Sequence, residues 1–311
     1  MRKLRRVIPY SRVFWRRQGP TIIGDPENDE GSSHEPSVIY DGDPEILAGN
    51  VFKMWWVGGW TTQHLNYAES LDGITWTNLG TNPVIDNICR SYVFKDGATY
   101  YCYGNVHPGL GQFDLYTSSD GVNWVLDTAA VISLGAGGQW DDDELGNIYV
   151  WKEGASDWRC FYEGTQSTTV WKIGYATSSD GREWVKDAGN PVISETGSLG
   201  VGHVYKSVAN VYWMWTHYSS TGVLPTDVKR WWSNDLTTWN FDRNTFFRST
   251  SDEGHASSVG QIADVCFLEL NSTLYMWYAA ALDGNSANNM LIKVATAPFT
   301  FEQIITMNED T

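Results

Sequence analysis

Variants of the phrase Ser-x-Asp-Gly-x-x-Trp recur along this chain and constrain its fold more than any other feature. Four copies occupy residues 67–76, 115–124, 175–184 and 231–239, and a degenerate fifth copy occupies 294–301. A unit of this size cannot bury its own apolar face, so it must pack on its neighbours. The repeat therefore predicts one domain built from five similar units.

Short apolar strands, each followed by an aromatic strand, run in step with this phrase. The aromatic strands occupy 53–57, 100–103, 158–162, 211–215 and 274–278. The apolar strands begin near five residues that are 55, 57, 56 and 61 positions apart: Glu35, Arg90, Asn147, His203 and Asp264. Four short strands per unit, separated by Gly, Asp and Asn, are typical of a propeller blade. We predict an all-β fold, a five-bladed β-propeller with four antiparallel strands per blade.

The turn chemistry and the chain start agree with this prediction. Asp-Gly between two strands suits a tight hairpin, and the Trp three residues later can pack over the blade edge. The stretch 15–23 repeats the strand-and-exit pattern that follows the first and third blades, so we expect it to close the ring against the last blade. The predicted domain is 11–311, and residues 1–10 form a basic N-terminal arm.

The basic arm belongs to a tract that holds a third of the 21 Lys and Arg residues, namely Arg2, Lys3, Arg5, Arg6, Arg12, Arg16 and Arg17. Such a run is usually solvated, and docking to an acidic surface is the alternative. The tract lacks the apolar core and cleavage site of a secretory signal. We therefore expect a cytoplasmic protein, or one that is virus-borne or released by lysis.

Composition excludes several classes of partner. The net charge of −16 argues against a nucleic-acid groove, which needs clustered cations. No apolar run approaches the roughly 20 residues of a membrane span. The 17 Trp residues and 42% hydrophobic content give ample apolar area for one domain, which we expect to be a monomer.

The four cysteines, Cys89, Cys102, Cys160 and Cys266, fall in predicted strands and show no Cys-x-x-Cys spacing. They are expected to be small buried hydrophobic residues rather than a disulfide framework or a metal site. We predict no cofactor and no metal ligands; a structural calcium ion is compatible with the fold, but no motif indicates one.

Strand order indicates which residues share one face of the propeller. The starts of the inner strands and the loops between the second and third strands lie on the same rim. This rim collects Glu35, Arg90, Asn147, His203 and Asp264 at the centre, with Trp60, His64, His107 and His217 around them, and the stretch 139–147 with Trp140 and Asp143 at the entry to the third blade. The predicted substrate-binding residues are Arg90, His203, Trp60, His64, Trp140, Asp143 and Asn147.

The chain resembles the five-bladed propeller glycosidases, the clan of glycoside hydrolase families 32, 43, 62 and 130. The resemblance covers roughly residues 11–305 and includes that group's Asp-Pro-x-Val-Ile, which reads here Glu35-Pro-Ser-Val-Ile39. It implies a base or nucleophile on the first blade, an Asp that tunes ionisation on the second, and an acid on the third. By position these would be Glu35 and Glu144, with Asp141, Asp142 and Asp143 as rivals for the acid. Arg90 departs from the pattern on the second blade, and Asp264 is a candidate for the shifted role.

Paired carboxyls suit glycoside cleavage, because one must donate a proton and the other must activate water or attack carbon. The predicted catalytic residues are Glu35, Glu144 and Asp264, and the predicted function is a glycoside hydrolase acting on an oligo- or polysaccharide in an axial pocket. Two alternatives stay open: a catalytically silent carbohydrate-binding propeller, such as an adhesin, and a glycoside phosphorylase. The plainer interpretation of Glu35 is a buried ion pair with Arg90.

Overall fold

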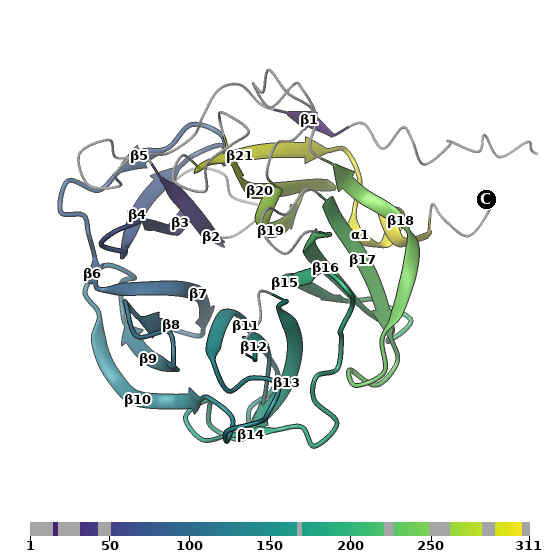
Figure 1. Cartoon of the computed structure of the whole chain (residues 1–311). Helices are drawn as coiled ribbons and strands as arrows, with labels where there is room; N and C mark the ends of the chain where they lie inside the picture. Colours follow the sequence, from purple (N-terminus) through teal and green to yellow (C-terminus); the bar gives the residue numbers. More distant parts are fainter. Residues whose placement is uncertain are drawn as a thin grey trace, which may run out of the picture.

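The computed structural model describes residues 15–17, 32–42, 51–166, 170–220, 227–248, 262–281 and 290–306. Five antiparallel sheets stand around a central axis, which confirms the predicted five-bladed β-propeller (Figure 1). The innermost strands β2, β7, β11, β15 and β19 surround the axis. The predicted arm at 1–10 lies outside the described residues, so the boundary at residue 11 stays a prediction.

Each blade follows chain order from the axis outward. The first blade contains β2 (Ser33–Asp41), β3 (Val51–Gly58), β4 (His64–Ser70) and β5 (Thr77–Asn78), with β6 (Ile85–Asp86) also on β4. The second contains β7 (Ile88–Asp96), β8 (Thr99–Val106), β9 (Gln112–Ser118) and β10 (Val125–Ser133). The third contains β11 (Glu144–Gly154), β12 (Asp157–Thr165), β13 (Lys172–Ser178) and β14 (Trp184–Lys186). The fourth contains β15 (Ser198–Lys206), β16 (Tyr212–Ser219), β17 (Asp227–Ser233) and β18 (Asn240–Arg248).

The fifth blade closes the ring with a strand from the chain start. Its own strands are β19 (Ile262–Leu270), β20 (Thr273–Ala281) and β21 (Met290–Ala297), and β1 (Arg16–Arg17) pairs with β21 as the outer strand. Arg16 lies opposite Thr296 in this ladder. The predicted closure by the stretch 15–23 is confirmed for its described residues, 15–17. The short helix α1 (Phe301–Thr306) follows β21.

The repeated phrase joins neighbouring blades. Its Asp folds the hairpin, as Asp120 does by accepting hydrogen bonds from the backbone N–H groups of Val122 and Asn123. The glycine carbonyl then accepts a hydrogen bond from an aromatic side chain of the preceding blade. These bonds run from Trp55 to Gly121, from Tyr103 to Gly181 and from Trp277 to Gly73, at 2.7, 2.7 and 3.0 Å. We call them the glycine latches; each ties two adjacent blades.

The far ends of three inner strands carry a second repeated contact, which we call the lysine clasps. In each clasp, a lysine of one blade pairs with an acid of the preceding blade and lies over an aromatic ring of its own blade. The three clasps are Lys95 with Asp41 and Tyr100, Lys152 with Asp96 and Trp158, and Lys206 with Glu153 and Tyr212. Between these two sets of contacts, apolar clusters fill the blade junctions.

All four cysteines are buried and free, as predicted. Burial raises the pKa of the Cys89 and Cys266 thiols to about 12. In the described part of the chain, no helix has the length and apolar character needed to span a membrane.

Candidate functional site

Every inner strand carries a β-bulge near its start. The register shifts lie between His34 and Ser37, Cys89 and Tyr92, Leu145 and Ile148, Val201 and His203, and Ala263 and Cys266. Each bulge interrupts the ladder and redirects the side chains within it. Because the strands share one direction around the axis, all five bulges face the same end of the central channel.

Three bulges hold a charged residue in a left-handed backbone conformation. The φ angles of Glu35, Arg90 and Asp264 are 55°, 53° and 51°. Such angles are unfavourable for residues other than glycine and concentrate at functional sites. The equivalent strain on three separate blades, each time beneath a charged side chain, identifies this end of the channel as the candidate site.

Hydrogen bonds join the bulges across the axis. The Asp264 carboxylate accepts from the backbone N–H of Glu35 at 3.3 Å and from Nδ2 of Asn147 at 2.9 Å. The Glu35 carboxylate in turn accepts from the backbone N–H of Ser91 at 3.1 Å. Four of the five blades therefore hold one connected polar group.

Glu35 is ionised in this setting. It is only 6% exposed, and burial alone would raise the pKa of its carboxyl. His34, whose Nδ1 lies 3.2 Å from Oε1, outweighs that effect together with Arg90 and the Ser91 N–H, so the pKa is lowered. Burial alone would lower the pKa of His34, but the attraction and hydrogen bond of Glu35, together with the charge of Asp264, raise it.

A second buried carboxyl, Glu163, has the opposite shift. It lies near the end of β12 and is 3% exposed, and its Oε1 accepts the backbone N–H of Val201 at 2.7 Å. Burial raises its pKa to about 8, although Arg90 and two backbone donors act against the shift. Gly146 permits this placement, because a Cβ there would overlap the Glu163 carboxyl and Trp171. A pKa of about 8 favours the protonated form of Glu163 at neutral pH.

Arg90 connects the two carboxyls electrostatically. Its charge lowers the pKa values of both Glu35 and Glu163, and its guanidinium carbon lies 5.6 Å from the centre of the Trp171 ring. Burial disfavours the charged guanidinium, but the surrounding carboxylates raise the pKa of Arg90. The arginine thus stays charged beside one ionised and one protonated acid.

All five bulges line a small cavity of about 30 Å³. Its lining includes Glu35, Ser91, Asn147, Gly202 and Asp264. The buried Oδ1 of Asn147 has no hydrogen-bond partner among the described residues. A cavity of this size with polar walls suits a water molecule rather than a sugar ring.

Histidine and tryptophan side chains border the group. Nδ1 of His217 accepts the backbone N–H of Asp264 at 3.2 Å, and burial lowers the pKa of this histidine. Trp60 is 43% exposed and lies edge-on to His34, with ring centroids 6.5 Å apart. His64 is buried at the start of β4, where its backbone pairs with Asp86.

The described hydrogen bonds and ion pairs do not link the acidic stretch 139–144 to this group. Glu144 is half-buried in the ladder opposite Thr165, and no described hydrogen bond or ion pair links its side chain to Glu35. Asp141 is buried in an ion pair with Lys186 at 2.6 Å. Asp143 is exposed, and Trp140 packs against Tyr162 with ring centroids 5.6 Å apart.

His203 lies away from the group, because its place in the strand differs from the one that repeat spacing predicts. Val204 pairs with Met214 as Val150 pairs with Cys160, so the position equivalent to Asn147 is Val201. His203 instead contacts an aromatic cluster, stacked 5.5 Å from Phe301. Burial lowers its pKa to about 3, so it is neutral. This placement removes His203 from the candidate binding residues.

Repeat spacing brought Glu35, Arg90, Asn147 and Asp264 together but missed Glu163, His34 and Trp171. One signal for Glu163 exists in the sequence. The second strand of each blade contains a buried Cys or Met, and the five strands can be aligned on that residue. Three positions later, only the third blade has a carboxylate, which is Glu163 after Cys160. The other four blades have Val57, Asn105, His217 and Ala279 there.

The arrangement supplies a proton donor, an ionised carboxylate and a fixed cation within one buried group. Environments that push two carboxyl pKa values apart are the requirement for general acid–base chemistry near neutral pH. Among the described residues, no cluster of three or more His, Cys, Asp or Glu side chains is arranged to hold a metal ion.

Comparisons with known proteins match the fold. No protein-family model matches the chain, and no curated protein matches its sequence. A solved structure described as a glycoside hydrolase is 16% identical, with a TM-score of 0.73 over 92% of this chain and 93% of that one. Zg3597, a family 117 glycoside hydrolase from Zobellia galactanivorans, is 12% identical, with a TM-score of 0.61 over 92% of each chain. The β-1,2-mannobiose phosphorylase of Listeria innocua is 16% identical, with a TM-score of 0.60 over 80% of this chain and 70% of that one. The predicted resemblance to propeller glycoside hydrolases is confirmed at the level of the fold.

Proposed function

We propose that this protein is a glycosidase in which Glu163 is the general acid and Glu35 is the base or nucleophile. The observation that carries the proposal is the opposite shift of two buried carboxyl pKa values beside one arginine: lowered at Glu35 and raised to about 8 at Glu163. The fold shared with glycoside hydrolases supports the reaction class. Glu163 thus replaces Glu144 as our candidate acid.

In the proposed reaction, the Glu163 carboxyl transfers its proton to the glycosidic oxygen as the bond from that oxygen to the anomeric carbon breaks. The leaving oxygen keeps the bonding electron pair and departs as a hydroxyl. Glu35 either removes a proton from the water that attacks the anomeric carbon, or attacks that carbon itself. In the second case water later releases the sugar, and Glu163 takes back a proton.

The remaining residues have positioning roles in this proposal. Asp264 fixes the backbone of Glu35 and the amide of Asn147 by hydrogen bonds of 3.3 and 2.9 Å. His34 and Arg90 keep Glu35 ionised, and Arg90 limits the rise in the pKa of Glu163. Asn147 offers its unpartnered oxygen to a substrate hydroxyl or to the water in the cavity. Exposed Trp60, beside His34, is our candidate platform for a sugar ring.

The cations of the site favour phosphorolysis as a second candidate reaction. Arg90 is charged, and the raised pKa of His34 favours its charged form, so an anion can be held near the anomeric carbon. The similarity in fold to a mannobiose phosphorylase is compatible with this reaction. Phosphate would then replace water as the attacking group.

The test is product release from a panel of plant, algal and bacterial oligosaccharides, with and without inorganic phosphate, followed by mass spectrometry. Free sugar from wild type but not from Glu163→Gln supports the glycosidase. Sugar phosphate formed only when phosphate is present supports the phosphorylase. Retained binding of a glycan without cleavage would replace both with a carbohydrate-binding propeller. Proton NMR of the first-formed anomer distinguishes inversion from retention.

A further inference from the structure

A second pocket lies between the third and fourth blades, at the far ends of their inner strands. It has a volume of about 320 Å³ and is lined by Trp151, Lys152, Glu153, Val204, Lys206 and Tyr212. Along β11, Asn147 and Glu153 are six residues apart, which corresponds to about 20 Å of extended strand. The pocket therefore opens on the face of the propeller opposite the candidate active site.

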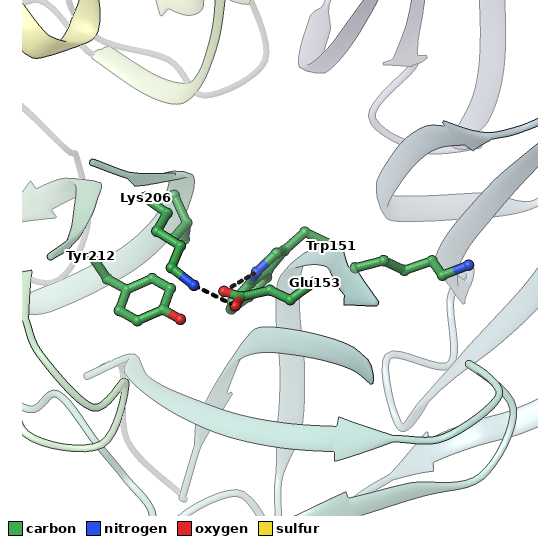
Figure 2. Close-up of a pocket in the computed structure, with 6 residues that line it drawn as sticks. Trp151, Glu153, Lys206 and Tyr212 are labelled. Carbon is green, nitrogen blue, oxygen red and sulfur yellow. Dashed lines mark hydrogen bonds and ion pairs between the residues drawn. The ribbon is translucent and has the colours of Figure 1, made fainter. Parts of the chain in front are cut away.

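The pocket is built around one of the lysine clasps. Nζ of Lys206 lies 2.7 Å from the Glu153 carboxylate, and Trp151 Nε1 donates to the same carboxylate at 3.4 Å. Figure 2 shows the Lys206–Glu153 pair between the Tyr212 ring and Trp151. The polar pair thus stands between two aromatic walls.

The first clasp has a related arrangement of charged and aromatic groups. Between the first two blades, Nζ of Lys53 bonds both Asp41 and the Tyr100 hydroxyl, at 2.7 and 2.8 Å, and so occupies the junction. The residue at the same place in the third blade is Arg159, next to the buried Cys160. Its guanidinium donates two hydrogen bonds of 2.8 Å to Asp157 and one of 3.2 Å to the Tyr212 hydroxyl, so it forms one edge of the junction.

The charges around the pocket cancel. The cations Lys152, Lys206 and Arg159 each have a carboxylate partner, and these partners are Asp96, Glu153 and Asp157. An anionic ligand would therefore meet as many negative groups as positive ones. A neutral polyhydroxylated ligand meets no such repulsion, because its hydroxyls can accept from lysine and donate to carboxylate.

The volume is at the lower end of the roughly 300 to 1,000 Å³ typical of small-molecule sites. Aromatic walls with a few fixed polar groups suit a sugar, whose ring has apolar faces and a polar edge. Glu153 is well fixed, because Arg159 also approaches it at 3.4 Å. We propose that this pocket is a second binding site for a neutral mono- or disaccharide, separate from the axial site.

The test uses the full chain carrying Glu163→Gln, so that no probe is consumed. Cellobiose, xylobiose and lactose are the neutral probes, and inorganic phosphate and digalacturonic acid are the anionic ones. We expect at least one neutral disaccharide to bind in calorimetry and to appear beside Trp151 and Tyr212 in soaked crystals. Tyr212→Phe and Lys206→Met should each weaken that binding about tenfold, the effect of losing one well-placed polar contact.

Trp151→Leu should weaken binding further, and the two milder variants keep the test valid if this one fails to fold. Binding of the anionic probes alone, neutral binding that the variants leave unchanged, no neutral binding, or binding at crystal concentration only would each overturn the proposal. The same pocket variants in the wild-type background report on the axial site through product release. Failure of the proposed glycosidase is thereby distinguished from failure of the second site.

Discussion

The backbone N–H of Glu35 donates a hydrogen bond to the Asp264 carboxylate, 229 residues further along the chain, at 3.3 Å. This contact joins the first blade to the last across the axis. It forms only when the ring is closed, and the pairing of β1 with β21 and the bond from Trp277 to Gly73 both contribute to closure. The candidate site is therefore a property of the complete propeller, and each prediction below concerns a residue whose role depends on a neighbouring blade.

Replacing Glu163 tests the assignment of the acid. Glu163→Gln removes the proton that the leaving oxygen needs, so turnover on a natural glycoside should fall about 10² to 10⁴-fold. Substrates with an activated aryl leaving group need less protonation and should lose less. Initial rates on both substrate types provide the measurement.

Glu144→Gln is the matched control for that variant, since Glu144 lies on the same blade without a described contact to Glu35. It should keep nearly full turnover. Full activity of Glu163→Gln, together with a large loss in Glu144→Gln, would return the acid role to Glu144.

Arg90 should set both limbs of the pH profile. In wild type, kcat/KM should fall as the pH rises through about 8, where Glu163 loses its proton, and as the pH drops through the lowered pKa of Glu35. Arg90 lowers both pKa values, so Arg90→Met should move both limbs to higher pH. Rates measured across the pH range check this, and unmoved limbs would show that the guanidinium is too distant to act.

The fold could be predicted because its signals are local and repeated. Asp-Gly turns, aromatic strands and the phrase ending in Trp each act within about ten residues, and five copies reinforce one another. Closure of the ring by the start of the chain could be predicted for the same reason. A shared rim could also be predicted for Glu35, Arg90, Asn147 and Asp264, because each lies at the start of an inner strand.

The acid could not be placed in this way, because its chemistry is set by other parts of the chain. The pKa of Glu163 depends on burial against Gly146, on the Val201 N–H and on Arg90, which are separated in sequence. His203 failed for a different reason. The position equivalent to Asn147 is Val201, two residues before His203, so spacing taken from the other blades selected a residue of the aromatic cluster.

We expect His203 to be dispensable for activity and to lower the stability of the folded protein at acidic pH. Its pKa of about 3 in the folded protein is below the ordinary value of 6.5, so the unfolded chain binds the extra proton first. Its contribution to stability is therefore lost progressively as the pH falls from about 6.5 to about 3. His203→Phe should retain turnover and should unfold at a higher temperature than wild type at pH 4, with a smaller difference at pH 8. Loss of turnover in this folded variant would restore His203 to the site.

Gly121 should be the least replaceable residue of the glycine latches. Its φ is 82°, and a Cβ there would lie 2.6 Å from Cζ2 of Trp55, the side chain that donates to its carbonyl. Gly121→Ala therefore combines backbone strain with overpacking at a blade junction, and we expect it to lower the free energy of unfolding by about 2 to 4 kcal/mol.

Gly97→Ala is the control: the φ angle of Gly97 is 59°, and nothing lies within 4 Å of the added Cβ. That variant carries only the backbone cost, about 1 kcal/mol. Urea denaturation of both variants gives the comparison, and equal losses would mean that the contact between Gly121 and Trp55 adds nothing to blade docking.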